Sequence, residues 1–109
     1  MTTLEDVCDD LVHRTDVFKA LSDPVRMDLF LRIAAVEEIS CTALVAEADV
    51  SASTVSYHVK ILKAAGLVAV RKQGRHYHYT PRPAALIHLA GLLNTLATRK
   101  PVSPAAPAA

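Results

Sequence analysis

The sequence predicts one small domain that is mainly α-helical and carries a single β-hairpin. Five segments have apolar residues at helical spacing, and one pair of short β-prone runs flanks a glycine-containing turn. With 109 residues, 51% of them apolar, the chain is long enough to bury one hydrophobic core. We therefore expect a folded domain over residues 1–98 and a disordered Pro/Ala-rich tail over residues 99–109.

The first two helices are predicted from their apolar stripes and from one capping signal. The first helix spans residues 3–21. The second begins at Asp23, which can cap, and Pro24, which fits the first helical position, and it continues to about residue 36. The stripe of the first helix consists of Leu4, Val7, Cys8, Leu11, Val12, Thr15 and Phe18; the second helix is expected to bury Val25, Leu29, Ile33 and Val36.

Two further helices, over residues 40–48 and 51–64, are joined by a tight turn. The turn contains Asp49, a residue type that tolerates left-handed backbone angles. Ser40 or Thr42 can cap the shorter helix, and Ser51 the longer one. The predicted buried residues are Leu44, Val45 and Ala48 in the first and Val55, Val59 and Leu62 in the second, whose opposite face presents Ser53, Ser56, Tyr57 and Lys60.

A β-hairpin follows directly. Gly66 fits the end of the preceding helix, and strands are predicted over residues 68–71 and 76–79. The connecting residues, 72–75, include Gly74, which can supply the positive φ that a hairpin turn needs.

The last helix, over residues 84–98, is apolar on more than one side. Leu86, Leu89, Ala90, Leu93, Leu96 and Ala97 form a stripe that Ile87 and Leu92 broaden. A small domain has little surface with which to cover so much apolar area, so we expect this helix to pair with its copy in a homodimer, with the first helix alongside. The alternative is a core helix buried within one chain.

Charge is divided unevenly along the chain. Residues 1–49 carry eleven acidic residues against four Lys and Arg, whereas residues 50–109 carry eight Lys and Arg and no acidic residue. This asymmetry favours a surface for a polyanion in the second half of the domain. A solvated surface that is lopsided by chance is the alternative.

The pair of helices and the hairpin together predict a winged helix-turn-helix that binds double-stranded DNA. The outer face of residues 51–64 offers hydroxyls, a phenol and an ammonium group to base edges, and the cationic hairpin tip can reach phosphates, with Arg75 suited to a minor groove. An ordinary solvated hairpin tip, or a winged-helix module that binds proteins and not DNA, remains the alternative. The candidate DNA-binding residues are Thr42, Ser53, Thr54, Ser56, Tyr57, His58, Lys60, Arg71, Lys72 and Arg75.

Three stretches carry a family resemblance: ALSDPVRMDLFLRI, ALVAEADVSASTVSYHVKILKAAGLV and VRKQGRHYHYT. They resemble the ArsR/SmtB family of winged-helix transcriptional repressors, over roughly residues 18–80. The resemblance implies a homodimer that binds an inverted-repeat operator, with one recognition helix per half-site. It also implies DNA contacts from the residues that match the family's contact positions, which are Ser53, Thr54, Ser56, Tyr57 and His58.

The metal sites that the resemblance would imply are incomplete in this chain. Ser40 and Thr42 stand where one family type has two cysteines, and the last helix has only His88 where another type has several acids and histidines. We therefore predict no cofactor, and a metal or metalloid effector is not favoured by the ligand pattern. A thiol site of Cys8 and Cys41, joined by Asp9, Asp10 or His13, is a weaker possibility, because each cysteine also fits a small core position.

Several function classes are not supported. The sequence has no glycine-rich phosphate loop, no nucleophile with a recognisable base and no catalytic metal spacing, so we expect no enzyme activity. It has no signal-peptide pattern and no apolar run of membrane-spanning length. With only two cysteines, a cytoplasmic protein is expected.

Overall fold

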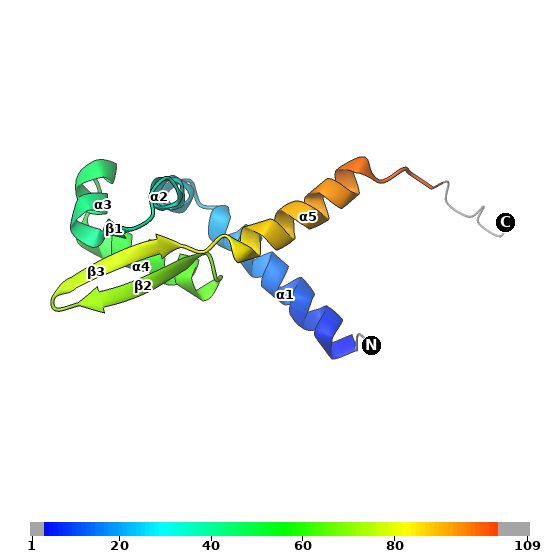
Figure 1. Cartoon of the computed structure of the whole chain (residues 1–109), viewed down its shortest axis with the longest axis horizontal. Helices are drawn as coiled ribbons and strands as arrows, with labels where there is room; N and C mark the ends of the chain where they lie inside the picture. Colours follow the sequence, from blue (N-terminus) through cyan, green and yellow to red (C-terminus); the bar gives the residue numbers. More distant parts are fainter. Residues whose placement is uncertain (1–3, 103–109) are drawn as a thin grey trace.

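The computed structural model describes the backbone of residues 4–102 and the side chains of residues 13–102 (Figure 1). Five helices and a small sheet follow one another in the predicted order. They are α1 (Leu4–Leu21), α2 (Pro24–Ala34), β1 (Ile39–Ser40), α3 (Cys41–Ala48), α4 (Ala52–Ala64), β2 (Val68–Gln73), β3 (His76–Pro81) and α5 (Ala84–Thr98). The predicted mainly α-helical fold with a winged helix-turn-helix is therefore confirmed.

Local capping explains where the central helices begin. The Asp23 carboxylate accepts from the amide of Arg26 at 3.0 Å, and this hydrogen bond lowers the pKa of Asp23. The hydroxyl of Ser40 caps α3, accepting from the Ala43 amide at 3.1 Å. Ser51 caps α4 in the same way, which places the start of each helix beside a side chain that satisfies its free amides.

Two left-handed residues end these helices. Asp49, between α3 and α4, has φ 53° and ψ 46°, as the tight turn predicts. Gly66 has φ 79° after α4, where the amides of Gly66 and Leu67 donate to the carbonyls of Lys63 and Leu62. This double hydrogen bond is the Schellman arrangement, and it turns the chain from α4 directly into β2.

The sheet has three antiparallel strands in the order β1-β3-β2. Gln73 pairs with His76, so Gly74 and Arg75 form a two-residue turn with a positive φ at Gly74. The strands are longer than predicted, and β1 was not predicted. It pairs Ile39 with Tyr79 and Ser40 with His78, which no local pattern in a two-residue strand reveals.

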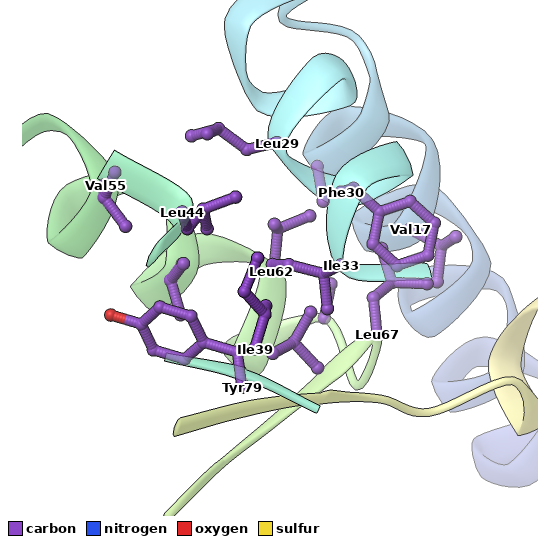
Figure 2. Packing of buried hydrophobic residues seen from close by; sticks show 14 of the residues in the cluster. Val17, Leu29, Phe30, Ile33, Ile39, Leu44, Val55, Leu62, Leu67 and Tyr79 are labelled. Atoms are coloured by element: carbon purple, nitrogen blue, oxygen red, sulfur yellow. The ribbon is translucent and has the colours of Figure 1, made fainter. Parts of the chain in front are cut away.

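The hydrophobic core lies between α2, α3, α4 and the sheet, with the end of α1 closing one side (Figure 2). We call this part of the molecule the body. Its fully buried side chains come from every element around it, and include Val17, Leu29, Ile33, Leu44, Val55, Leu62, Leu67 and Val68. The predicted inner face of α4, made of Val55, Val59 and Leu62, is confirmed.

In α2 the prediction of the buried face is partly wrong. Leu29 and Ile33 are buried, but Val25 and Val36 are exposed, and Phe30 and Arg26 are buried in their place. Val36 lies beyond the helix, which ends at Ala34, so it does not continue the helical stripe. Val25 lies in the first turn, where the core-facing position is taken by the Arg26 side chain.

The helices α1 and α5 extend away from the body in different directions and form two arms (Figure 1). Among the described side chains of α1, Val17 and Ala20 in its last turns reach the core, whereas Thr15 and Phe18 of its predicted stripe are exposed. The side chains of Leu4, Val7, Cys8, Leu11 and Val12 lie outside the described ones. At its two described positions the stripe does not face the core; the core-facing positions in this part of the helix are Val17 and Ala20, which are equally apolar.

The α5 arm is mostly uncovered within one chain. Leu89 is buried, but Ile87 is 67% and Leu96 58% exposed, and Leu93 is exposed as well. A core helix buried within one chain is therefore excluded. Residues 99–102, the described part of the expected tail, contain no helix or strand, and residues 103–109 lie outside the described residues.

Candidate nucleic-acid interface

The outer face of α4 carries four of the ten predicted DNA-binding residues. Ser53, Ser56, Tyr57 and Lys60 are exposed along it, and Tyr57 is the most prominent at 62%. This face follows from the helix's own period, since the apolar residues of α4 alternate with these polar ones every three or four positions. It can therefore offer donors and acceptors at the depth of a DNA groove.

The hydroxyls at the start of α4 form a small network. The Ser51 oxygen lies 2.7 Å from the Thr54 hydroxyl and 3.1 Å from the Ser53 hydroxyl. Thr54 is half-buried as a result, whereas Ser53 is exposed. Thr42 is exposed in the first turn of α3, the other helix of the pair. Hydroxyls at two neighbouring helix starts suit phosphate and base-edge contacts.

The hairpin tip adds two exposed cations, Lys72 and Arg75. The Lys72 ammonium lies 5.7 Å from the centre of the Tyr77 ring, a cation–π geometry. Arg75 stands in the turn itself, next to Gly74. Because the tip projects beyond the body, both side chains can approach a DNA backbone beside the recognition helix (Figure 1).

An open hollow of ≈ 250 Å³ joins α4 to the hairpin. Its apolar lining comes from Val59, Val70 and Tyr79, and its polar lining from Ser56, Lys60, Lys63 and Tyr77. Lys63 and Tyr77 were not among the predicted DNA-binding residues. The signal that could have identified Lys63 is its spacing: it follows Ser56 and Lys60 at i+7 and i+3 on the same helix face.

The Arg71 side chain, which the sequence assigns to DNA binding, is paired with other side chains of the same chain. Its guanidinium donates to Glu38 at 2.8 Å and to Gln73 at 2.9 Å. His78 lies 3.5 Å from the same Glu38 oxygen, and Thr80 lies 3.5 Å from the other one. The hydrogen bond from Arg71 lowers the pKa of the Glu38 carboxyl.

Glu38 therefore brings an acidic group to a region whose own sequence has none. It stands just before β1, and the pairing of β1 with β3 carries it to the hairpin. Because 33 residues separate Glu38 from Arg71, no local pattern could predict this ion pair.

His58 lies inside the body and not on the outer face of α4. Its side chain is only 8% exposed, and its Nδ1 atom lies 3.3 Å from the Arg26 guanidinium. Direct contact between this imidazole and a base is therefore not supported. The helical period explains the position, since His58 follows Val55 by three residues and shares its inward-facing side.

The candidate sensing residues are only partly described. Cys41 is a free, half-buried cysteine beside Tyr79, while the side chain of Cys8 lies outside the described ones, so the predicted pairing of the two thiols stays a prediction. His13 and His88 line one hollow of ≈ 270 Å³ between α1 and α5. Among residues whose side chains are described, no three His, Cys, Asp or Glu gather as metal ligands would.

Within the described part of the chain, no helix combines the length and apolar character needed to cross a membrane.

Comparison with known proteins agrees with this geometry. A family model described as "Helix-turn-helix domain" matches residues 21–71. The chain is 36% identical over 85 residues to the uncharacterised HTH-type transcriptional regulator YceK of Bacillus subtilis, covering 76% of this chain and 85% of that protein. It is 33% identical over 67 residues to the arsenical resistance operon repressor of Escherichia coli, covering 62% and 57% respectively.

Among solved structures, an ArsR-like transcriptional regulator from Rhodococcus sp. RHA1 superposes with a TM-score of 0.73 at 28% identity, covering 82% of this chain and 83% of that one. These relatives are transcriptional regulators and not enzymes. The family model spans α2, β1, α3, α4 and the first part of β2. The chain belongs to the ArsR family of winged-helix DNA-binding transcriptional regulators.

Proposed function

We propose that this regulator is a repressor that binds an inverted-repeat operator as a homodimer. In each half-site α4 lies in the major groove and the hairpin tip contacts the neighbouring backbone. The observation that supports this most directly is the continuous polar and cationic surface from Ser53 through Lys60 and Lys63 to Lys72 and Arg75. Its charges match the phosphates, and its hydroxyls and phenol suit base edges.

The proposed dimer is supported by the arms. On α5 the buried Leu89 is followed at i+4 and i+7 by the exposed Leu93 and Leu96, so one apolar stripe leaves the body uncovered. Phe18 is exposed on α1, the helix beside it. A second copy of the same chain supplies an equally apolar stripe, and two-fold symmetry is the simplest closed arrangement of such surfaces.

The proposed repressor binds DNA without a cofactor, because the positions of the family's two metal-site types hold Ser40, Thr42 and a lone His88. The operator affinity is therefore expected to stay unchanged when the protein is treated with EDTA and exchanged into metal-free buffer. A loss of affinity that zinc restores would show that a metal supports DNA binding.

The DNA-binding surface is tested by charge reversal. We expect Lys60→Glu with Arg75→Glu to abolish the preference for a duplex from the protein's own promoter over an unrelated duplex, measured by fluorescence anisotropy. The matched control is Arg32→Glu with Arg99→Glu, which changes the net charge equally but alters α2 and the end of α5. Sedimentation velocity checks that both double variants assemble as the unaltered chain does.

Two outcomes would contradict the proposal. If the Lys60/Arg75 variant still prefers the promoter duplex, the assigned surface is wrong. If the unaltered chain binds both duplexes weakly and equally, a protein-binding winged-helix adaptor explains the surface better.

A further inference from the structure

Arg26 is a buried cation between α1, α2 and α4, although it stands among apolar residues of α2. It is 9% exposed, and a guanidinium in such a place is stable only when its donors are paired. Its Nε donates to the Ala20 carbonyl at 2.5 Å, and its Nη2 to the Lys19 carbonyl at 3.1 Å. Both acceptors belong to the last turn of α1, so Arg26 ties the end of that arm to the body.

The remaining nitrogen of the guanidinium, Nη1, faces the recognition helix. It lies 3.3 Å from Nδ1 of His58. Arginine has donors and no acceptor, so His58 accepts at Nδ1 and carries its ring proton on Nε2 in this contact. The pairing fixes the rotation of the imidazole as well as its position. One guanidinium therefore spans from α1 to the middle of α4.

The imidazole in turn contacts the outer surface. Its ring centre lies 5.1 Å from that of Tyr57, and the two ring planes are inclined at 67°, an edge-to-face arrangement. Tyr57 is the largest side chain on the exposed face of α4, and a free side chain of this size would sample several rotamers. The contacts thus form a series from the end of α1 through Arg26 and His58 to Tyr57.

We propose that Arg26 and His58 are positioning residues for the DNA-binding surface: they hold the Tyr57 ring in the orientation in which it contacts DNA and couple that orientation to the end of α1. This inference rests on the proposed function, because it assigns the residues that regulate the same surface. Neither residue touches DNA in this account. Their effect is on the promoter preference, and it acts through Tyr57.

The substitution His58→Asn separates positioning from folding. Its amide oxygen can accept near the place of Nδ1, which keeps Arg26 paired, but the ring edge against Tyr57 is lost. We expect unfolding near the temperature of the unaltered chain and a promoter preference reduced about three- to tenfold, the range that an edge-to-face aromatic pair contributes. Tyr57→Ala should reduce the preference at least as much.

The double variant decides whether the two residues act together. If His58 acts through Tyr57, adding His58→Asn to Tyr57→Ala causes no further loss of promoter preference. Losses that multiply independently, or a His58→Asn variant with full preference, would overturn the proposal.

The orientation of the Tyr57 ring can also be tested without DNA, independently of the proposed function. In nuclear magnetic resonance spectra of the full chain, the Tyr57 ring signals should move in His58→Asn and move in the same direction in Arg26→Lys, which lacks the forked donor. Arg32→Lys, an exposed position in the same helix, is the matched control and should leave them unchanged. Unmoved Tyr57 signals in the first two variants would overturn the positioning role, whereas equal binding of both duplexes by the unaltered chain would overturn the proposed function.

Discussion

The body and the two arms solve the same problem, the burial of apolar side chains, in different ways. In the body, Leu44, Leu62 and Leu67 are fully enclosed by elements of one chain (Figure 2). Along α5, by contrast, the exposed Leu93 and Leu96 continue past Leu89 without cover from the described part of the same chain. The body therefore completes its core within one chain, whereas the α5 arm leaves apolar surface exposed.

The difference in burial predicts that truncating a leucine costs much more stability in the body than on the α5 arm. We expect Leu62→Ala to lower the free energy of unfolding by about 3 kcal/mol, because it leaves a cavity in a closed core. Leu96→Ala should change it far less at protein concentrations where the chain is monomeric, because Leu96 is already exposed there. Urea denaturation followed by circular dichroism measures both, and equal losses would contradict the distinction.

The proposed role of the α5 arm in the homodimer is tested by measuring how strongly the chain associates with itself. Leu93→Glu with Leu96→Glu should raise the dimer dissociation constant by about a hundredfold or more, since it places charges on a desolvated stripe. Sedimentation velocity over a concentration series measures the shift. Asn94→Glu with Thr98→Glu, on the polar side of α5, is the control, and equal dissociation by this pair would place the interface elsewhere.

Near its start, α4 has one serine that caps the helix and another on its outer face. Ser51→Ala should lower the free energy of unfolding by about 1 kcal/mol, because it removes the acceptor for the Thr54 amide. Ser56→Ala, on the outer face, should leave stability unchanged and weaken DNA binding. Thermal unfolding and anisotropy on the same samples distinguish these roles, and a stable Ser51→Ala variant would show that the cap is dispensable.

The ion pair between Arg71 of β2 and Glu38, just before β1, gives a smaller effect. Glu38→Gln should raise promoter affinity about two- to fivefold, because Arg71 gains freedom to contact phosphate once its exposed partner is neutral. Glu37→Gln removes the same charge one residue earlier and is the matched control. Equal gains in the two variants would show a general charge effect and no specific release of Arg71.

The smallest expected effect is a pH dependence at the start of α2. The pKa of Asp23 is lower in the folded chain than its usual value of 3.8, so its contribution to stability is complete above that value and is lost as the pH falls through the folded pKa. Asp23→Asn keeps a capping oxygen that does not titrate. Between about pH 6 and about pH 3, a range that spans the usual Asp pKa, the melting temperature of the unaltered chain should therefore fall more than that of the variant, and parallel decreases would contradict this account.

The sequence predicts the parts of the fold that depend on local chemistry. Caps at Asp23 and Ser51, left-handed turns at Asp49 and Gly66, and the inner face of α4 each follow from residues within one or two helical turns. The exposed α4 face and the hairpin tip were located for the same reason. That these residues contact DNA remains a prediction.

What the sequence does not reveal depends on partners distant in the chain. The buried Arg26–His58 contact joins residues 32 apart, and Glu38 reaches Arg71 only through the pairing of β1 with β3. The choice between two equally apolar faces of α1 is likewise made by the shape of the body, which fits Val17 and Ala20 against it. Local pattern contains no information on these distances.

The pairing of Glu38 with Arg71 has a consequence for how DNA binding depends on salt. A protein cation that replaces condensed counterions on DNA releases them, and the slope of affinity against salt concentration counts such cations. Were Arg71 to bind a phosphate, it would exchange one anion, the Glu38 carboxylate, for another, and that carboxylate would then recruit cations from solution. The salt slope of the unaltered chain would in that case count fewer cations than a structure of the complex shows at the phosphates.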